Sequence, residues 1–452
     1  MNGKKQKFIN LLKPKKMINK NTLEIIEWDE FDEYKILEIL KDKQKTSLED
    51  KQKASKVFEE LKKFASYEEN NQFLKLTKGG RCLKSCNFVG LIQTKSGFSL
   101  EILPKTSDRN EDKMKAKQLL EKMLKTLKNF PFKTINFSSI KTTQNSLLEI
   151  FVKMFLDELS VVIKKGIKSD YISIEENRFY LKGKVLFSNQ IRQNLINQQR
   201  FYTNADEYIS DIPQNRLIVS VLKLFSKIPL SNKIQSLLNQ YFFIFDGIGA
   251  SRNADKDFNL CVKSHSLKHY EIILSWCKVF LKKEIFTPYA GDSVGLALLF
   301  DMNKLFESFV AYCFKKYSQG WEISLQDKGK YLCKNNYKDI FALKPDIVAK
   351  QKADKIMILD TKWKKITSQK DINQADIYQI WSYVSKYKKI CDNVMAVLIY
   401  PAFLENCSVE SPFVFKADEK SKLHIVYIDL NKLIDDKKAS NEIKRIMDKF
   451  QI

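Results

Sequence analysis

One stretch decides the fold predicted for this chain, and it consists of Lys344-Pro-Asp-Ile-Val-Ala-Lys-Gln-Lys-Ala-Asp-Lys-Ile-Met-Ile-Leu-Asp-Thr-Lys362. Two apolar runs separated by a short polar turn predict a β-hairpin. Because side chains alternate along a strand, Asp360 and Lys362 share one face and Thr361 points to the other. Asp346 follows a proline, which lacks a backbone donor and suits a strand end. Pairing of the two arms then places Asp346 beside Asp360.

This pair of carboxylates with a nearby lysine has a chemical use. Two neighbouring carboxylates repel each other, and a divalent cation with oxygen ligands relieves that repulsion. A lysine beside such a cation can orient water or stabilise charge while a phosphodiester is cut. The pattern P-D-x(13)-D-x-K resembles the signature of the PD-(D/E)xK nuclease superfamily, whose core is a mixed sheet flanked by helices. The competing interpretation is a hairpin with a solvated charged end, since a lysine-rich chain contains D-x-K by chance.

Two predicted helices flank this hairpin in the sequence. Asp376 to Tyr383 forms an amphipathic pattern in which Gln379 and Tyr383 share a face, and this Q-x-x-x-Y helix resembles the one that follows the D-x-K strand in RecB-type nucleases. The alternative is an aromatic layer in the core. Asp301 to Phe314 predicts a helix behind an Asp N-cap, with Glu307 at the border of its buried stripe. Superfamily members commonly supply another metal-directed acid from such a helix, and the alternative is an ordinary solvated glutamate.

Length and charge favour a large protein with a polyanionic partner. At 452 residues the chain exceeds what one hydrophobic core normally organises. Lys and Arg number 78 against 54 acids, a net charge of +24 that favours nucleic acid over a small acidic molecule. Abundant Lys, Asn and Ile are also typical of AT-rich genomes, which weakens the charge argument.

Other classes of function have little to work with in this sequence. Three histidines, His265, His269 and His424, argue against a His-based nuclease or a Ser-His-Asp hydrolase. Of eight cysteines, Cys82 and Cys86 are the closely spaced pair, without nearby histidines to complete a zinc site, so we expect reduced, structural thiols. No apolar run reaches the roughly 18 residues that span a bilayer. We therefore expect a soluble, cytoplasmic protein with no membrane partner.

The pattern of apolar residues predicts an α/β protein, α+β overall, in three parts. Residues 1–110 are predicted to be β-rich, with a strand at Thr22–Trp28 and a hairpin at Phe88–Lys105. Residues 111–285 are predicted to be mixed and mainly helical, with one helix ending before Gly166. After a loop at Pro288–Gly295, residues 286–452 would form the nuclease domain with a mixed central sheet flanked by helices.

A series of short motifs in a fixed order resembles the McrC family, the nuclease subunit of McrBC-type, GTP-dependent restriction systems. The similarity spans roughly residues 85 to 400 and is weakest over the first 80. It rests on Val89–Gln93, Glu101–Lys105, Gly166 with Tyr171, Leu181–Lys184, Asp206–Tyr208, Asn215–Leu217 and Met302–Glu307, followed by the hairpin and its helix.

The resemblance implies a division of labour between this chain and a partner. An N-terminal region would dock on a hexameric, McrB-like AAA+ GTPase and stimulate it, and the C-terminal region would cut double-stranded DNA with Mg²⁺ in defence against foreign DNA. No G-x-x-x-x-G-K-[ST] loop occurs in the sequence, so GTP would be bound by the partner. The implied Mg²⁺ ligands are Asp346, Asp360, the Thr361 carbonyl and Glu307. Lys362 would assist the attacking water, with Gln379 and Tyr383 facing the site.

Two other classes of function remain open. A free-standing exonuclease of RecB type would act on DNA ends without a partner. A non-catalytic adaptor would activate a GTPase ring with a nuclease-like fold, but the intact set of Asp346, Asp360 and Lys362 argues against it.

Overall fold

The computed structural model describes most of the chain. The described residues are 21–41, 47–106, 113–127, 146–228, 230–261, 268–282, 294–335, 337–351, 355–403 and 409–450. The predicted loop before residue 294, the basic N-terminus, His265 and the eighth cysteine, Cys407, lie outside these ranges.

The chain folds into two compact units, and the second is inserted into the first. One unit comprises Met1–Leu147 together with Tyr289–Ile452, and the other comprises Leu148–Pro288. Helices and several mixed sheets confirm the predicted α/β class. The division into residues 1–110, 111–285 and 286–452 stays a prediction about functional parts, because these compact units have other bounds.

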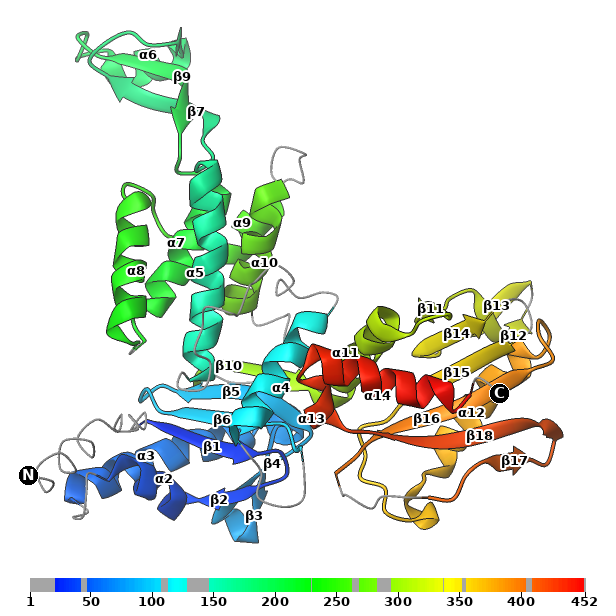
Figure 1. Cartoon of the computed structure of the whole chain (residues 1–452). Coiled ribbons are helices and arrows are strands. Elements are labelled where there is room, and N and C mark those ends of the chain that lie inside the picture. Colours follow the sequence, from blue (N-terminus) through cyan, green and yellow to red (C-terminus); the bar gives the residue numbers. More distant parts are fainter. Residues whose placement is uncertain are drawn as a thin grey trace, which may run out of the picture. The chain divides into compact units, whose positions relative to one another are not determined.

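The first unit contains a four-stranded sheet in the order β1-β6-β5-β10 (Figure 1). Its strands are β1 (Thr22–Ile26), β5 (Phe88–Thr94), β6 (Ser99–Leu103) and β10 (Val294–Asp301). β1 runs parallel to β6, whereas β5 is antiparallel to both β6 and β10. The predicted strand and hairpin are therefore confirmed. Gly97 makes the hairpin turn possible with a φ of +84°.

Helices and a smaller sheet cover this region. Apolar side chains of α2 (Glu33–Leu40) and α3 (Leu48–Ala65) pack with those of the four-stranded sheet in one core. The segment of chain between β1 and β5 also forms a three-stranded sheet, ordered β2-β4-β3. Its strands are β2 (Glu30–Asp32), β3 (Leu74–Thr77) and β4 (Cys82–Ser85). α4 (Lys113–Thr126) contributes a buried lysine, Lys117, which contacts β6.

The first unit also contains a six-stranded mixed sheet, ordered β11-β14-β15-β16-β18-β17. β14 and β15 are the antiparallel arms of the predicted hairpin, whereas β15, β16 and β18 are parallel. Because β15 lies in the middle of the sheet, nearly all its residues are buried. The strands are β11 (Glu322–Leu325), β14 (Ile347–Gln351), β15 (Lys355–Thr361), β16 (Val394–Pro401), β17 (Phe413–Phe415) and β18 (Asp418–Ile428).

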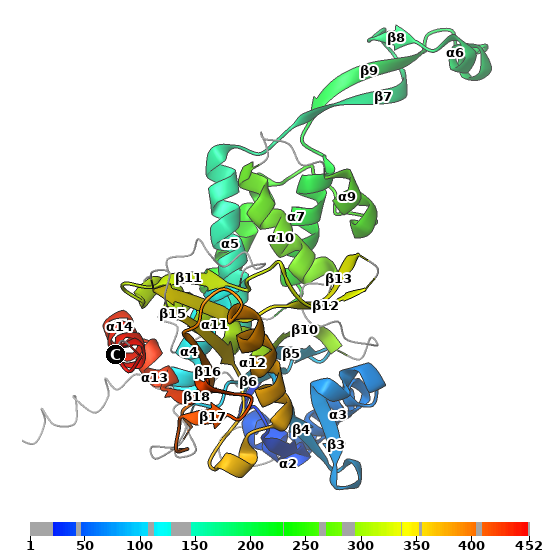
Figure 2. The same cartoon turned by 90° about the vertical axis from the view of Figure 1, so that its right-hand side faces the viewer.

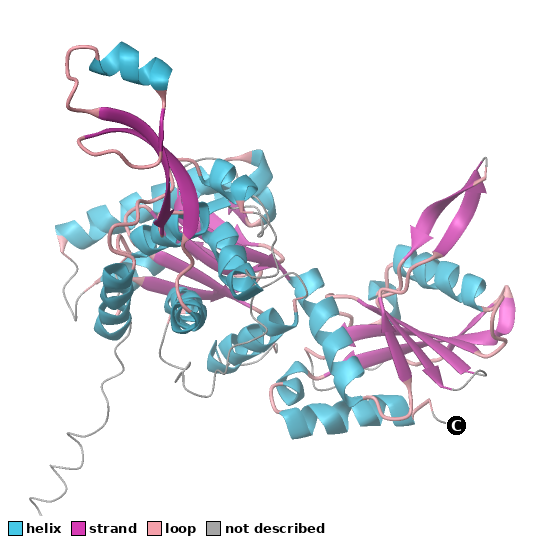
Figure 3. Ribbon diagram, turned by 90° about the horizontal axis from the view of Figure 1, so that it is seen from above, coloured by secondary structure: helices cyan, strands magenta, loops and turns pink. Residues whose placement is uncertain are grey.

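Helices lie on both faces of this sheet (Figure 3). α12 (Gln374–Tyr387) packs Ile380, Val384 and neighbouring side chains on one face. α11 (Met302–Tyr317) and α14 (Asp436–Asp448) lie on the other, and the short α13 (Leu430–Leu433) precedes α14 (Figure 2). Asp301 caps α11 by accepting a hydrogen bond from the Asn303 N–H at 2.9 Å, as predicted. Both predicted flanking helices are therefore confirmed.

A separate two-stranded hairpin precedes β14 in the sequence. Its strands are β12 (Lys330–Asn335) and β13 (Lys338–Leu343), paired antiparallel. Within the described ranges, neither of its strands pairs with the six-stranded sheet. Its end extends away from β11 and β15 (Figure 2).

The second unit contains a helical bundle. Its helices are α5 (Leu147–Lys165), α7 (Pro213–Phe225), α8 (Asn232–Ile244), α9 (Ala254–Leu260) and α10 (Lys268–Lys282). Phe155, Phe225 and Phe280 pack edge to face, with ring centroids 4.8–5.9 Å apart. Gly166 follows α5 with a φ of +95°, the predicted C′ position.

A long β-finger extends from this bundle (Figure 1). It comprises β7 (Asp170–Arg178), β8 (Lys184–Val185), α6 (Phe187–Asn194) and β9 (Phe201–Ile209), with β9 central in the sheet. Gly183 has a φ of +74°, and a Cβ there would lie 2.3 Å from the Asn204 carbonyl oxygen, so only glycine fits. Large apolar side chains are exposed near the end of the finger: Phe179, Tyr180, Leu181, Phe187, Ile191, Leu195 and Ile196. In the described part of the chain, no helix is long and apolar enough to cross a membrane.

Candidate active site

The hairpin brings Asp346 to the end of β15, as the sequence predicts. Ile347 pairs with Leu359, so the residue before β14 lies opposite the last residues of β15. The Thr361 N–H and hydroxyl both donate to Asp346 Oδ2 at 2.7 Å. These two hydrogen bonds fix one oxygen of the carboxylate at the strand end.

Lys362 is held by groups from two elements. Its ammonium pairs with Asp360 on the same strand face and donates to Gln379 Oε1 of α12 at 3.0 Å. Gln379 Nε2 in turn donates to the Tyr383 hydroxyl at 2.9 Å. The Asp360 side chain is only 1% exposed, whereas that of Lys362 is 17% exposed. The lysine therefore lies between a buried carboxylate and solvent.

Tyr383 has one part in the core and one at the site. Its ring belongs to the core under the sheet, and the residue is 5% exposed. Its hydroxyl accepts from Gln379 and lies 3.4 Å from the carbonyl of Lys344, two residues before Asp346. The helix thus uses a packed aromatic ring to position an exposed glutamine.

The electrostatics of the acids show an excess of negative charge. Burial, followed by the nearby Asp360 and Glu307, raises the pKa of Asp346 to about 7, although the Thr361 hydrogen bonds oppose the shift. Burial also raises the pKa of Asp360, and Lys362 only partly offsets it. Burial lowers the pKa of Lys362, but the adjacent Asp360 outweighs that effect and the net pKa is raised. Lys362 is therefore protonated at neutral pH.

Glu307 lies near the two aspartates, and it forms no ion pair with any residue that the structure describes. It is half-buried at the border of the apolar stripe of α11, as predicted, and accepts from Gln326 Nε2 at 2.9 Å. Its charge contributes to the raised pKa of both Asp346 and Asp360. Over the described ranges, no three His, Cys, Asp or Glu side chains meet closely enough to hold a metal ion between them.

The donor set nevertheless fits a hard divalent cation. Asp346 and Asp360 offer carboxylate oxygens, and the buried Thr361 at the strand end offers a backbone carbonyl. Oxygen ligands of this kind suit Mg²⁺ or Mn²⁺. Burial and, after it, repulsion from Asp360 and Glu307 raise the pKa of Asp346, and a bound cation would offset both effects.

Two positioning contacts near the site were not predicted. Trp363 directly follows Lys362, and its indole N–H donates to both oxygens of buried Glu27, at 3.1 and 3.0 Å. Its ring lies 5.2 Å from those of Phe306 and Phe403. A role for Trp363 near the site could have been predicted from the sequence, because this tryptophan directly follows the Asp360-Thr-Lys362 motif. Nothing in the sequence indicates Glu27, which lies 336 residues away.

A second unpredicted contact joins Lys364 to α12. The Lys364 ammonium donates to Asp376 Oδ2 at 2.7 Å, and the charge of Asp376 adds to the repulsion at Asp360. The polar end of β15 is thus attached to the first turn of the helix that carries Gln379.

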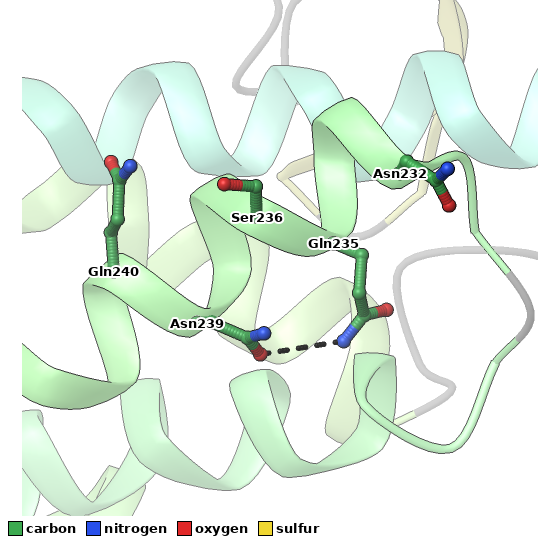
Figure 4. A pocket seen from close by; sticks show the side chains of 5 residues that line it. All are labelled: Asn232, Gln235, Ser236, Asn239 and Gln240. Carbon is green, nitrogen blue, oxygen red and sulfur yellow. Dashed lines mark hydrogen bonds between the residues drawn. The ribbon is translucent and has the colours of Figure 1, made fainter.

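A hollow elsewhere in the molecule lacks this kind of chemistry. It has a volume of about 520 Å³, lies on α8 in the second unit, and is lined by Asn232, Gln235, Ser236, Asn239 and Gln240 (Figure 4). Gln235 Nε2 donates to Asn239 Oδ1 at 3.4 Å. These side chains are all uncharged, so the hollow offers no acid, base or nucleophile pair comparable to the carboxylates at β15.

Comparison with known protein families places the chain in a class of restriction-system components. The family model described as McrBC 5-methylcytosine restriction system component matches residues 83–401. The chain belongs to this family, and the similarity to McrC inferred from its motifs is confirmed.

Named relatives agree with this assignment. The chain is 22% identical over 281 residues to the type IV methyl-directed restriction enzyme EcoKMcrBC of Escherichia coli strain K12, covering 57% of this chain and 77% of the relative. Its fold is similar to a chain in the tetradecameric assembly of Thermococcus gammatolerans McrB AAA+ hexamers with bound McrC. That match has a TM-score of 0.63 and 18% identity, covering 94% of this chain and all of the other.

Proposed function

We propose that this protein is the DNA endonuclease subunit of a McrBC-like restriction system. It would cut double-stranded DNA with Mg²⁺ and stimulate a separate AAA+ GTPase. The observation that carries the proposal is the cluster of Asp346, Asp360 and Lys362 at the end of β15 in a chain of the McrBC family. Metal-directed acids together with a fixed positive charge are a combination that can cut a phosphodiester.

Each residue of the cluster has a role in this proposal. Asp346, Asp360 and the Thr361 carbonyl would hold Mg²⁺, with Glu307 near enough to contribute. The ion, when bound, supplies positive charge to the phosphate and activates a water molecule. Lys362 keeps its proton because Asp360 raises its pKa. It would therefore stabilise developing negative charge and orient the water, rather than act as the base. Gln379 holds the ammonium in place.

The second unit is the part we assign to the GTPase partner. The related McrC is bound to McrB AAA+ hexamers in its assembly. In this chain, the β-finger exposes large apolar side chains such as Phe187 and Ile196, which are 74% and 90% exposed. Apolar surface of this kind favours a protein partner. GTP would be bound by that partner, since the sequence contains no P-loop.

The decisive experiment mixes the purified full-length chain with linear and circular DNA. With Mg²⁺ alone we expect almost no cutting, and with the partner GTPase and GTP we expect cleavage together with faster GTP hydrolysis. A full-length Asp360→Asn variant should stimulate hydrolysis without cutting. Deleting residues 286–452 is a poorer control, because it removes β10 from the four-stranded sheet.

The same experiment separates the alternatives. Rapid degradation from DNA ends in Mg²⁺ without nucleotide would reject GTPase coupling in favour of an autonomous exonuclease. Faster GTP hydrolysis with no cleavage under any condition would favour a non-catalytic adaptor.

A further inference from the structure

The β12–β13 hairpin has features that its packing does not explain. A two-stranded hairpin outside a larger sheet is at best marginally stable in water. This one exposes Leu332, Tyr337 and Phe341, which are 47%, 95% and 67% exposed. Tyr337 and Phe341 have φ values of +69° and +59°, a region that non-glycine residues seldom adopt. Strained backbone conformations of this kind are often found at functional sites, so they suggest that the hairpin has a function.

The base of the hairpin is attached to the helix that serves the candidate active site. The Lys330 ammonium pairs with Asp327 at 2.9 Å and lies 4.3 Å from the centroid of the Tyr387 ring. The Tyr387 hydroxyl donates to the same aspartate. Tyr387 belongs to α12, which also carries Gln379. The second strand of the hairpin ends at Leu343, which pairs with Lys330 at the base and lies three residues before Asp346. Its base is therefore fixed relative to the acids.

The outer end of the hairpin has the charge and surface of a nucleic-acid contact. Lys334 and Lys338 flank the turn, and among the described residues neither ammonium has a carboxylate partner. The Lys334 ammonium lies 5.9 Å from the centroid of the Tyr337 ring, which pre-organises a positive charge beside an exposed aromatic face. Lysines that track phosphates next to an aromatic ring that stacks on bases or sugars are typical of DNA-binding surfaces.

We infer that the β12–β13 hairpin is a DNA-binding arm of the nuclease part of the chain. Lys334 and Lys338 contact phosphates of the duplex, and Tyr337 packs against an exposed base or sugar. Because the base of the arm is attached to α12, these contacts set the position of the DNA relative to Asp346 and Asp360. This role rests on the proposed nuclease function. The arm contacts the DNA backbone and does not recognise a particular base sequence.

The test measures binding of a 40-base-pair duplex to the full-length chain, with Ca²⁺ in place of Mg²⁺, over a range of salt concentrations. Each phosphate contact contributes about 0.9 to the slope of log K against log salt. The double variant Lys334→Gln/Lys338→Gln should therefore lower that slope by about 2 and weaken binding about tenfold. Tyr337→Ala should weaken binding at least about fivefold, whereas Tyr337→Phe, which keeps the ring, should bind like the parent.

The matched control is Lys437→Gln/Lys438→Gln, which removes the same charge from exposed positions at the start of α14. An equal loss in the control, or an unchanged slope in the hairpin variant, would overturn the role of the arm. Normal DNA binding with lost GTPase stimulation would assign the arm to the protein partner instead.

The experiment also distinguishes failure of the arm from failure of the proposed nuclease function. A parent chain that binds through the arm but never cuts contradicts the nuclease, and a parent that cuts with an unaffected hairpin variant contradicts only the arm.

Discussion

Two buried acid–lysine clusters in the first unit can be compared directly. In the four-stranded sheet, Glu101 of β6 pairs with Lys117 of α4 at 2.8 Å, and its other oxygen accepts from the Leu147 N–H at 2.6 Å. In the six-stranded sheet, Asp360 of β15 pairs with Lys362. Both acids are almost completely buried, and burial raises the pKa of both.

The clusters differ in the charge that surrounds the buried acid. One oxygen of Glu101 accepts from the Leu147 N–H and the other pairs with Lys117. Two more acids lie near Lys117: Glu24, whose side chain is 35% exposed to water, and Glu121, which also has Lys125 beside it. Asp360 instead has Asp346 and Glu307 as neighbours, and one lysine serves all three carboxylates. The Glu101 cluster carries less excess negative charge, because Lys117 and Lys125 lie beside its acids, and we expect it to stabilise the fold. A cluster with excess negative charge costs stability unless a cation binds, which is the expectation for a functional site.

The largest expected effect breaks the second cluster. Asp360→Asn should lower DNA cleavage by about a thousandfold or more, because groups that act together lose most of their effect when one is removed. Lys362→Ala should behave similarly. GTPase stimulation should be unchanged in both, since the site does not bind nucleotide. The measurement is the rate of DNA cleavage with the partner, GTP and Mg²⁺. Undiminished cleavage by either variant would contradict the assignment of the site.

The next effect breaks the first cluster. Lys117→Met leaves Glu101 buried without its partner, and such losses cost about 3 kcal/mol of stability. Urea unfolding should report the loss, while cleavage per folded molecule stays normal. Lys53→Met is the matched control, because the Lys53 pair with Glu49 is exposed and should contribute about 0.5 kcal/mol or less. Equal losses for the two variants would contradict a structural role for the buried cluster.

A smaller effect concerns the pH dependence of stability. The pKa of Asp346 is about 7 in the folded protein, above its unfolded value. The folded state therefore binds this proton more tightly, so the free energy of unfolding should fall as pH rises from about 4 to about 7. Asp346→Asn should remove that fall and be more stable than the parent at pH 8, by about 1 kcal/mol or more.

Added Mg²⁺ sharpens the same test. At pH 8 the ion should raise the melting temperature of the parent, because it binds the folded state and neutralises the acids. It should have little effect on Asp346→Asn. If neither Mg²⁺ nor Mn²⁺ changes the melting temperature of the parent, these carboxylates do not bind a cation between them.

How much of this was predictable depends on the range of the contacts involved. The hairpin, its Asp346 and Asp360 pairing, and the α12 face with Gln379 and Tyr383 follow from local periodicity, and the structure agrees. Strand β10 was not predicted. It is an apolar run just before a helix, and its partner β5 lies about 200 residues earlier in the sequence.

Contacts between distant parts of the chain were also beyond prediction. The bond from Trp363 to Glu27 needs the end of β1 to meet the end of β15, and no local pattern encodes that meeting. The insertion of residues 148–288 as a unit of their own follows from the same kind of long-range pairing, since β10 returns to a sheet begun by β1, β5 and β6.

The smallest expected effect concerns Gln379, which connects the second cluster to α12. Its side chain is exposed, so Gln379→Ala should hardly change the melting temperature. It should lower cleavage about tenfold, because Lys362 loses one of the two groups that hold its ammonium. Gln374→Ala is the matched control. Gln374 is also exposed on α12, and its Nε2 donates to the hydroxyl of Tyr378, four residues on, at 2.5 Å. Unlike Gln379, it is not the glutamine that accepts from the Lys362 ammonium. Normal cleavage by Gln379→Ala, or an equal loss in Gln374→Ala, would mean that Asp360 alone positions the lysine and that the helix contributes only packing.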